Sequence, residues 1–208
     1  MNLFNCPDSV IIFCVLQHIS YFDLDDILLS SGLPPKLAAQ IKLQVYLRRL
    51  TCEVEDLGDG LTVTRYTVEG LLHREGDLPA LVYSNGGKTY MKKNVIHRDV
   101  GPAVWTYNKL TDEFTIIYMR HGVRHNDGDS PSIITSKGTM IWFKYGKQTR
   151  GNDLPSARYA NGDLHWTQND KLHRLKKPAI ITIKGDMYYY EYGIPVHQEL
   201  WKIGHVPY

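Results

Sequence analysis

The sequence predicts an α+β fold in which a small N-terminal helical module precedes a repeated antiparallel β-hairpin meander. Residues 1–52 place apolar side chains at helical spacing. From residue 57 onward a pattern of about 24 residues recurs, which is typical of a repeat architecture. Fourteen Tyr, seventeen Gly and ten Pro favour strands and turns. We therefore divide the chain into a helical module, 1–56, and a β-repeat array, 57–208, of about five and a half repeats.

Composition and charge narrow the function classes. With 208 residues, 43% hydrophobic and 22% charged, the chain is expected to be globular rather than disordered. Its net charge of +2 is too small to indicate nucleic-acid binding. Three cysteines without CxxC spacing fit a reducing compartment, and the longest apolar run, Val10 to Leu16, is too short to span a bilayer. We expect a protein that is not secreted and that stays inside a cell or inside a particle assembled there.

The first 52 residues predict three helices. Pro7 suits a first helical position, and apolar residues follow three and four apart at Ile11, Ile12, Val15, Leu16 and Ile19. Asp23 is expected to N-cap a short second helix that Gly32 ends. Pro34 and Pro35 open a third helix with apolar residues at Leu37, Ile41, Val45 and Leu50. A helical segment this short rarely forms a stable core alone. The module should therefore pack on the array, on a partner, or on both.

The array is defined by two residues that recur together. The anchor positions, at intervals of 24, 28, 24, 24 and 24 residues, are His73, His97, His125, Thr149, His173 and His197. Seven residues before each anchor stands an aromatic residue: Tyr66, Tyr90, Tyr118, Trp142, Trp166 and Tyr190. With aromatics at 11% of the chain, this coincidence has a chance probability on the order of one in a million, so the repeat is real.

Each unit predicts two antiparallel strands. The aromatic residue lies in the first strand, which is followed by a turn and then by the His. A Pro comes next and precedes the second strand. The residue after each Pro is small and should leave room for a neighbouring aromatic: Ala80, Ala103, Ser132, Ser156 and Ala179. A longer tip at 108–112 accounts for the 28-residue interval. The meander should have about eleven strands and extend roughly 50 Å with a twist, its aromatics along one side.

The unit G-x-x-H-R-x-x-x-P-A resembles a divergent form of the MORN repeat that is frequent in large DNA viruses. The resemblance covers Leu61 to His197. It implies an elongated single sheet. The standard MORN repeat has a 23-residue period and Gly where this chain has Pro.

The N-terminal segment CPDSVIIFCVLQHISYFDLDDILLSS is similar to an F-box. The residues that stand where F-box proteins contact their Skp-type adaptor are Pro7, Val10, Ile11, Leu16, Ile19 and Leu24. The resemblance implies a ubiquitin-ligase adaptor. An F-box-like start often precedes such repeats in the viral families, which strengthens the two resemblances taken together. A structural component of a virus particle, minor capsid or internal, in which helices and sheet join neighbouring subunits, is an alternative. A membrane-surface scaffold is a further one, through Lys92, Lys93, Lys176 and Lys177, although solvated turns are the simpler interpretation.

The recurring polar residues have structural and functional interpretations. We expect the His side chains to hydrogen-bond turn backbone, because equivalent residues two strands apart lie ~9–10 Å from one another, too far to share a metal. The arginines Arg74, Arg98, Arg150 and Arg174 should pair across their own turns, as with Asp77 and Asp153, the alternative being a phosphate-binding row. The aromatics should form the sheet's own core, or a platform for bases or a peptide. No catalytic motif is present, so we expect a non-enzymatic interaction protein without cofactor or metal, able to dimerise through sheet edges.

Overall fold

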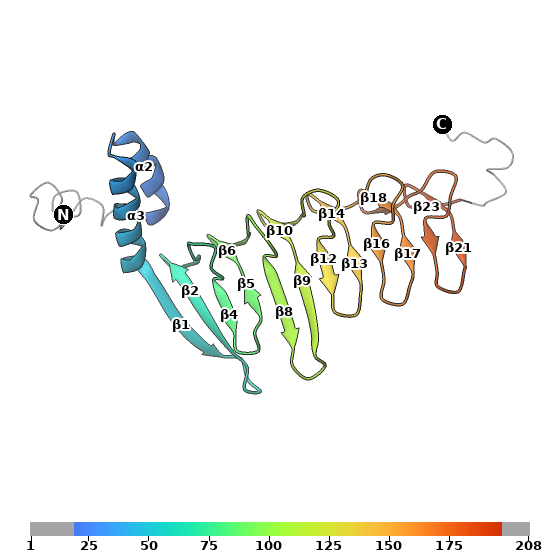
Figure 1. Ribbon diagram of the computed structural model, residues 1–208, viewed down its shortest axis with the longest axis horizontal. Coiled ribbons are helices and arrows are strands. Elements are labelled where there is room, and N and C mark those ends of the chain that lie inside the picture. The colour runs from blue at the N-terminus through green and yellow to red at the C-terminus, as the bar shows by residue number, and fades with distance from the viewer. Residues whose placement is uncertain (1–18, 197–208) are drawn as a thin grey trace, which may run out of the picture.

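The computed structural model describes residues 19–196 and consists of a helical module at one end of a long antiparallel sheet (Figure 1). The helices are the 3₁₀ helix η2 (Tyr21–Asp23), α2 (Leu24–Ser30) and α3 (Pro35–Arg49). The first predicted helix, which was expected to begin at Pro7, lies outside the described residues. The same holds for the predicted partner-contact residues Pro7, Val10, Ile11 and Leu16. The predicted α+β organisation, helices followed by a β meander, is confirmed.

Local sequence explains where the two described α-helices begin and end. The Ser20 hydroxyl accepts a hydrogen bond from the N–H of Phe22 and so caps the start of η2. Asp23 occupies the N-cap of α2 but makes no capping hydrogen bond, contrary to expectation. Pro35 opens α3, as predicted. Leu50 was expected to lie in this helix, but it is extended and begins the first strand.

Within residues 19–196 the main sheet has 13 strands, all paired antiparallel. Its order is β1-β2-β4-β5-β8-β9-β12-β13-β16-β17-β20-β21, with β3 paired to β2. The strands of its first half are β1 (Leu50–Asp56), β2 (Thr62–Val68), β3 (Leu71–Leu72), β4 (Leu81–Tyr83), β5 (Lys88–Thr89), β8 (Val104–Asn108) and β9 (Glu113–Ile117). The rest are β12 (Ile133–Thr135), β13 (Met140–Ile141), β16 (Ala157–Arg158), β17 (Leu164–His165), β20 (Ile180–Ile181) and β21 (Met187–Tyr188). The sheet therefore begins at Leu50, within the segment that the sequence assigned to the helical module.

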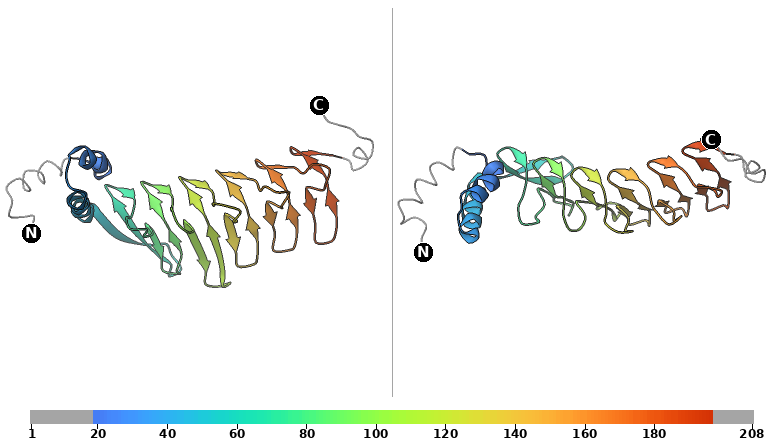
Figure 2. Two further views of the ribbon diagram at one scale, coloured as in Figure 1. Left: turned by 45° about the horizontal axis from the view of Figure 1, so that its top comes forward. Right: turned by 90° about the horizontal axis from the view of Figure 1, so that it is seen from above.

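Short two-stranded hairpins run along one side of the main sheet, which was not predicted (Figures 1 and 2). We call these the side hairpins. They are β6–β7 (Met91–Lys92 and Val95–Ile96), β10–β11 (Met119–Arg120 and Val123–Arg124), β14–β15 (Phe143–Lys144 and Lys147–Gln148), β18–β19 (Thr167–Gln168 and Lys171–Leu172) and β22–β23 (Tyr190–Glu191 and Ile194–Pro195). Each repeat thus has two strands in the main sheet and a side hairpin between them.

A two-residue turn with positive φ at both residues closes every side hairpin. The turn pairs are Lys93–Asn94, His121–Gly122, Tyr145–Gly146, Asn169–Asp170 and Tyr192–Gly193, and Glu69–Gly70 is the equivalent pair between β2 and β3. Positive φ at both positions is the signature of a type I′ turn, whose twist matches that of the strands. The N–H of each second turn residue also donates to a carbonyl of the preceding unit, as from Gly122 to Ile96 at 2.9 Å. Neighbouring side hairpins are therefore hydrogen-bonded to each other through their turns.

The helical module packs on the first strands of the sheet. Its buried core is Tyr21, Leu24, Leu28, Ile41, Val45 and Tyr46, joined by Val68 of β2. The expectation that the module packs on the array is confirmed. Farther along the array, the small residue after each Pro is fully buried: Ala80, Ala103, Ser132, Ser156 and Ala179. Each lies beside an aromatic, whose backbone N–H donates to its carbonyl, as from Tyr90 to Ala103 at 2.8 Å.

Candidate interaction site

An aromatic ring stacked under an arginine marks the start of the β2–β3 hairpin and of the side hairpins β6–β7, β14–β15 and β18–β19. The guanidinium carbon lies 3.6–3.9 Å from the ring centroid in the pairs Arg74–Tyr66, Arg98–Tyr90, Arg150–Trp142 and Arg174–Trp166. Each arginine also donates to the carbonyl of the Pro in its own unit, and Asn126 makes the same contact with Pro131. The arginine therefore fastens the loop onto the aromatic.

The arginines pair with aspartates of the preceding unit, so the predicted pairing across a single turn is wrong. Arg98 binds Asp77 through two hydrogen bonds of 2.8 Å. Arg174 binds Asp153 in the same way, at 2.6 and 3.0 Å. Arg150 reaches back to Asp129 rather than to Asp153. Because the units stack side by side, the carboxylate of one loop lies next to the guanidinium of the next.

The histidines also join one unit to the next. The Nδ1 atom of His97 accepts a hydrogen bond from the N–H of His121 at 3.0 Å. The Nδ1 atoms of His125 and His173 accept from Tyr145 and Tyr192, both at 3.3 Å. In these three pairs the centroids of the two side-chain rings lie 4.2–4.4 Å apart. The imidazoles of His97, His125 and His173 thus bind turn backbone as predicted, whereas the buried Nδ1 atom of His73 has no hydrogen-bond partner among residues 19–196. Among residues 19–196 there is no group of three or more His, Cys, Asp or Glu that could hold a metal ion.

The last repeat is shifted by one residue from the predicted alignment. In the earlier units the anchor N–H donates to the carbonyl of the aromatic seven residues before it, as from His173 to Trp166. In the last unit this bond runs from Val196 to Tyr189. Tyr189 therefore takes the position assigned to Tyr190, because the Tyr192–Gly193 turn sets the hairpin register. His197 lies outside the described residues.

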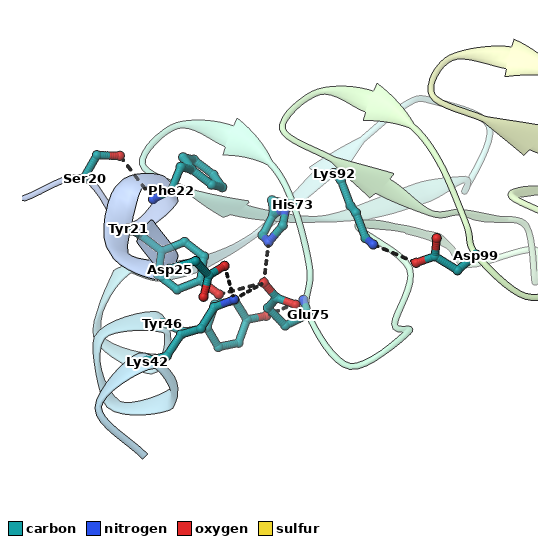
Figure 3. Close-up of polar contacts among 10 residues, drawn as sticks. All are labelled: Ser20, Tyr21, Phe22, Asp25, Lys42, Tyr46, His73, Glu75, Lys92 and Asp99. Carbon is teal, nitrogen blue, oxygen red and sulfur yellow. Dashed lines mark hydrogen bonds and ion pairs between the residues drawn. The ribbon is translucent and has the colours of Figure 1, made fainter. Parts of the chain in front are cut away.

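The helical module contacts the first repeat through a partly buried polar cluster around Glu75 (Figure 3). The Tyr21 hydroxyl donates to Glu75 Oε1 at 2.7 Å, and His73 Nε2 lies 3.2 Å from the same oxygen. The N–H of Glu75 donates to the Tyr46 hydroxyl at 3.2 Å. Lys42 Nζ lies 3.9 Å from Glu75 Oε1. One carboxylate thereby connects η2 and α3 to the array.

The electrostatics of this cluster follow from its contacts. The hydrogen bond with His73, assisted by Tyr21 and Lys42 and opposed by burial, lowers the pKa of Glu75 to about 2. Burial, with the nearby Glu75 carboxylate, raises the pKa of Tyr21 far above its usual value. Glu75 is thus ionised and Tyr21 neutral across the physiological range, which keeps the hydrogen bond between them intact.

A second carboxylate and an aromatic contact complete the junction. Glu69 accepts hydrogen bonds from the Ser20 hydroxyl at 2.6 Å and from the N–H of Tyr21 at 2.8 Å, and it pairs with Arg49. The Phe22 ring packs edge-on against His73, with centroids 5.2 Å apart. The helices therefore cover the first unit much as each unit covers its neighbour, which is the role of a terminal cap in a repeat array.

Sequence reasoning missed Glu69 and Glu75, although one signal was present. An acidic residue stands two positions after each of the first three anchors, at Glu75, Asp99 and Asp127, and each lies within 3.3 Å of its histidine. Glu69 had no comparable signal, because its role depends on helices far away in the sequence.

The described residues that the F-box resemblance assigned to partner contact are covered by the module's own core rather than exposed to a partner. Leu24 is only 1% exposed and lies within the module's own core. Ile19 is partly buried against that core. The apolar side chains that the helices present to solvent are different ones: Leu29 is 82% exposed, Leu43 52% and Leu47 54%. Leu43 and Leu47 lie one turn apart on α3, and we call this pair the exposed leucine patch; it is the strongest candidate for a docking surface on the helices.

The main sheet is a single layer with apolar side chains on both faces. Trp105 stands opposite Ile116, Ile116 opposite Ile134 and Ile134 opposite Met140, so these residues share one face. Two aromatics of the repeat, Tyr118 and Trp142, follow Ile116 and Met140 of this face by two positions, just beyond the ends of β9 and β13. The opposite face carries Val104, Ile117, Ile133 and Ile141. Both faces could therefore contact other proteins.

Three of the four lysines predicted as an alternative lipid site make intramolecular contacts. Lys92 pairs with Asp99 at 2.8 Å, and Lys177 pairs with Asp153 at 2.6 Å. The Lys93 ammonium lies 4.6 Å from the centroid of the Phe22 ring. Carboxylates thus partly neutralise the charges of Lys92 and Lys177, and the Phe22 ring attracts that of Lys93.

No protein-family model and no curated protein sequence matches this chain. In the described part of the chain, no helix has both the length and the apolarity needed to cross a membrane.

Proposed function

We propose that this protein is a non-enzymatic adaptor for protein–protein interactions, in which the helical module binds one partner and the β-repeat sheet offers an extended surface to a second. The exposed leucine patch carries the proposal. Leu43 and Leu47 are one turn apart on α3, on the side away from the buried Ile41 and Val45. A helix surface that faces only water is normally polar, so exposed leucines at this spacing favour contact with another helix.

The F-box resemblance supplies the class of partner, a Skp-type adaptor of a cullin-type ubiquitin ligase in the host cytoplasm. With Leu24 buried, docking would use Leu29, Leu43 and Leu47 together with the segment that contains Pro7, Val10, Ile11 and Leu16. The series of stacked hairpin units supports the MORN-like interpretation of the array. In this proposal the array holds the target protein.

Binding of the full chain to a purified Skp-type adaptor tests the proposal. The unmodified chain should co-purify with the adaptor, and Leu43→Asp with Leu47→Asp should abolish this, as should Leu16→Asp. Val54→Asp is a matched control, because Val54 is exposed but lies on β1. If the unmodified chain does not bind, or if the leucine variants bind as well as the control, the adaptor function is rejected.

A structural role in a large DNA virus particle is the second candidate. A single-layer sheet with apolar side chains on both faces is suited to burial between neighbouring subunits. Mass spectrometry of purified particles tests it, and absence of the protein from the particles would reject this role.

A further inference from the structure

The main sheet has two terminal strands, β1 and β21, and their chemistry differs. Among residues 19–196 each of them pairs with a single main-sheet neighbour, β1 with β2 and β21 with β20. A terminal strand presents unpaired backbone N–H and C=O groups, which another strand can bind. They lie at opposite ends of the molecule, β1 beside the helical module and β21 at the far end (Figure 1).

Strand β1 is protected against pairing with a copy of itself. It carries three carboxylates among its exposed residues, Glu53, Glu55 and Asp56. Two β1 strands running antiparallel would bring these like charges together, which is unfavourable. Charged side chains on a terminal strand are a common means of preventing such association.

Strand β21 lacks this protection. Met187 is 56% exposed and Tyr188 48%, and no charged residue occurs from Met187 to Tyr190. In the interior strands, the residues equivalent to Tyr188 are covered: Thr89 is buried, and Ile117, Ile141 and His165 are partly buried. The exposure of Tyr188 thus follows from the lack of a neighbouring strand in the described part of the chain.

The sequence after Val196 does not continue the repeat. Every earlier unit returns to the main sheet through a Pro and a fully buried small residue, 13 or 14 positions after its aromatic, as with Ala179 after Trp166. Counted from Tyr189, these positions are Lys202 and Ile203, and neither follows a proline. Larger side chains would not fit where Ala or Ser packs against an aromatic.

We propose that β21 pairs antiparallel with β21 of a second copy of this chain, so that two sheets join at their C-terminal ends into one continuous sheet. A two-fold axis perpendicular to the sheet makes such an interface self-complementary and closed. Because the helical modules lie at the other ends, the dimer presents them far apart. It could engage two partner molecules at once, which raises avidity without new contacts. This inference is independent of the identity of the helical module's partner.

Light scattering after size-exclusion chromatography of the full chain tests the proposal. The unmodified protein should be a dimer at micromolar concentration. The double variant Met187→Lys with Tyr188→Lys, which places like charges across the two-fold axis, should raise the dissociation constant by about 100-fold or more. Val54→Lys, an exposed position on β1, is the matched control and should remain dimeric. A circular dichroism spectrum equal to that of the unmodified chain verifies folding of each variant.

Hydrogen exchange provides the second measurement and does not depend on a variant. The β21 amides should exchange slowly at concentrations where the dimer forms and faster on dilution. A monomer at all concentrations would overturn the proposal, and slow β21 exchange in that monomer would assign this edge to residues 197–208. A dimer that persists in the β21 double variant, or that is lost in Val54→Lys, would also overturn it.

Discussion

Arg174 and Asp153 provide a direct test of how neighbouring repeats are joined. Two hydrogen bonds of 2.6 and 3.0 Å connect them, the Arg174 side chain is 14% exposed and the Asp153 side chain 44%. A bidentate charged pair is among the stronger polar contacts, but solvent screens a carboxylate this exposed. We therefore expect a coupling energy of about 1 kcal/mol in a double-mutant cycle with Ala at both positions.

The single substitutions differ in what else they remove. Arg174→Ala also removes the guanidinium from the Trp166 ring, 3.8 Å from its centroid, so it should lower the free energy of unfolding by about 2 kcal/mol. Asp153→Ala removes the contact with Lys177 as well, and the cycle excludes this contribution from the coupling. Urea unfolding followed by tryptophan fluorescence measures all four proteins.

A second cycle on Arg150 and Asp153, three residues apart in sequence, is the matched control. Because Arg150 binds Asp129, its coupling to Asp153 should stay below about 0.3 kcal/mol. Strong coupling within the Arg150–Asp153 pair, together with none between Arg174 and Asp153, would refute the pairing between units. Arg174 and Lys177 hold the pKa of Asp153 well below its usual value. The coupling should therefore be complete above about pH 4 and decline as the pH falls through the lowered pKa.

Three further predictions concern packing, protonation and the turns. Ala179→Leu should destabilise the fold by about 2 kcal/mol or more in urea unfolding, because its site is fully buried, whereas the exposed Ala160→Leu should have little effect. Because the pKa of Glu75 is lowered to about 2, this residue should stabilise the fold above about pH 4.5, and the stabilisation should be lost as the pH falls toward 2. Glu75→Gln should remove this pH dependence of the free energy of unfolding. An acid profile of Glu75→Gln equal to that of the unmodified chain would contradict the account. Gly122→Val should cost about 1–2 kcal/mol in thermal unfolding, because φ is +80° there, while Gly151→Ala, at ordinary φ with open space around it, should be nearly neutral.

The parts of the fold that could be predicted depend on local patterns. Pro35 and the apolar spacing of Ile41 and Val45 indicated α3, and the recurring Pro with a small residue indicated the returning strands. Strand β1 was missed because it has no buried face: its residues after Leu50 are all exposed, so no apolar alternation marks it. It forms because its backbone pairs with β2 over the whole length, from Leu50 opposite Val68 to Asp56 opposite Thr62.

The contacts that connect distant segments could not be inferred in the same way. Arg98 and Asp77 are 21 residues apart, whereas a carboxylate three residues after an arginine, as with Arg150 and Asp153, made a local pair the simpler expectation. Which carboxylate an arginine meets depends on how far successive units are offset when they stack. Likewise, Glu69 acquires its function only because the helices fold back over the first hairpin.

The departures from the repeat pattern indicate which feature controls its register. Thr149 and Val196 replace the anchor histidine, and Asn126 replaces the arginine, yet these units keep the same hairpin bonds. The positive-φ turn pair, in contrast, is present in every described unit, even where the pair is Asn169–Asp170 and contains no glycine. In the last unit the histidine lies one position away from the anchor, and the hairpin follows the turn pair rather than the histidine. The turn geometry therefore sets the register, and the histidine and arginine stabilise a stack whose spacing the turns have already determined.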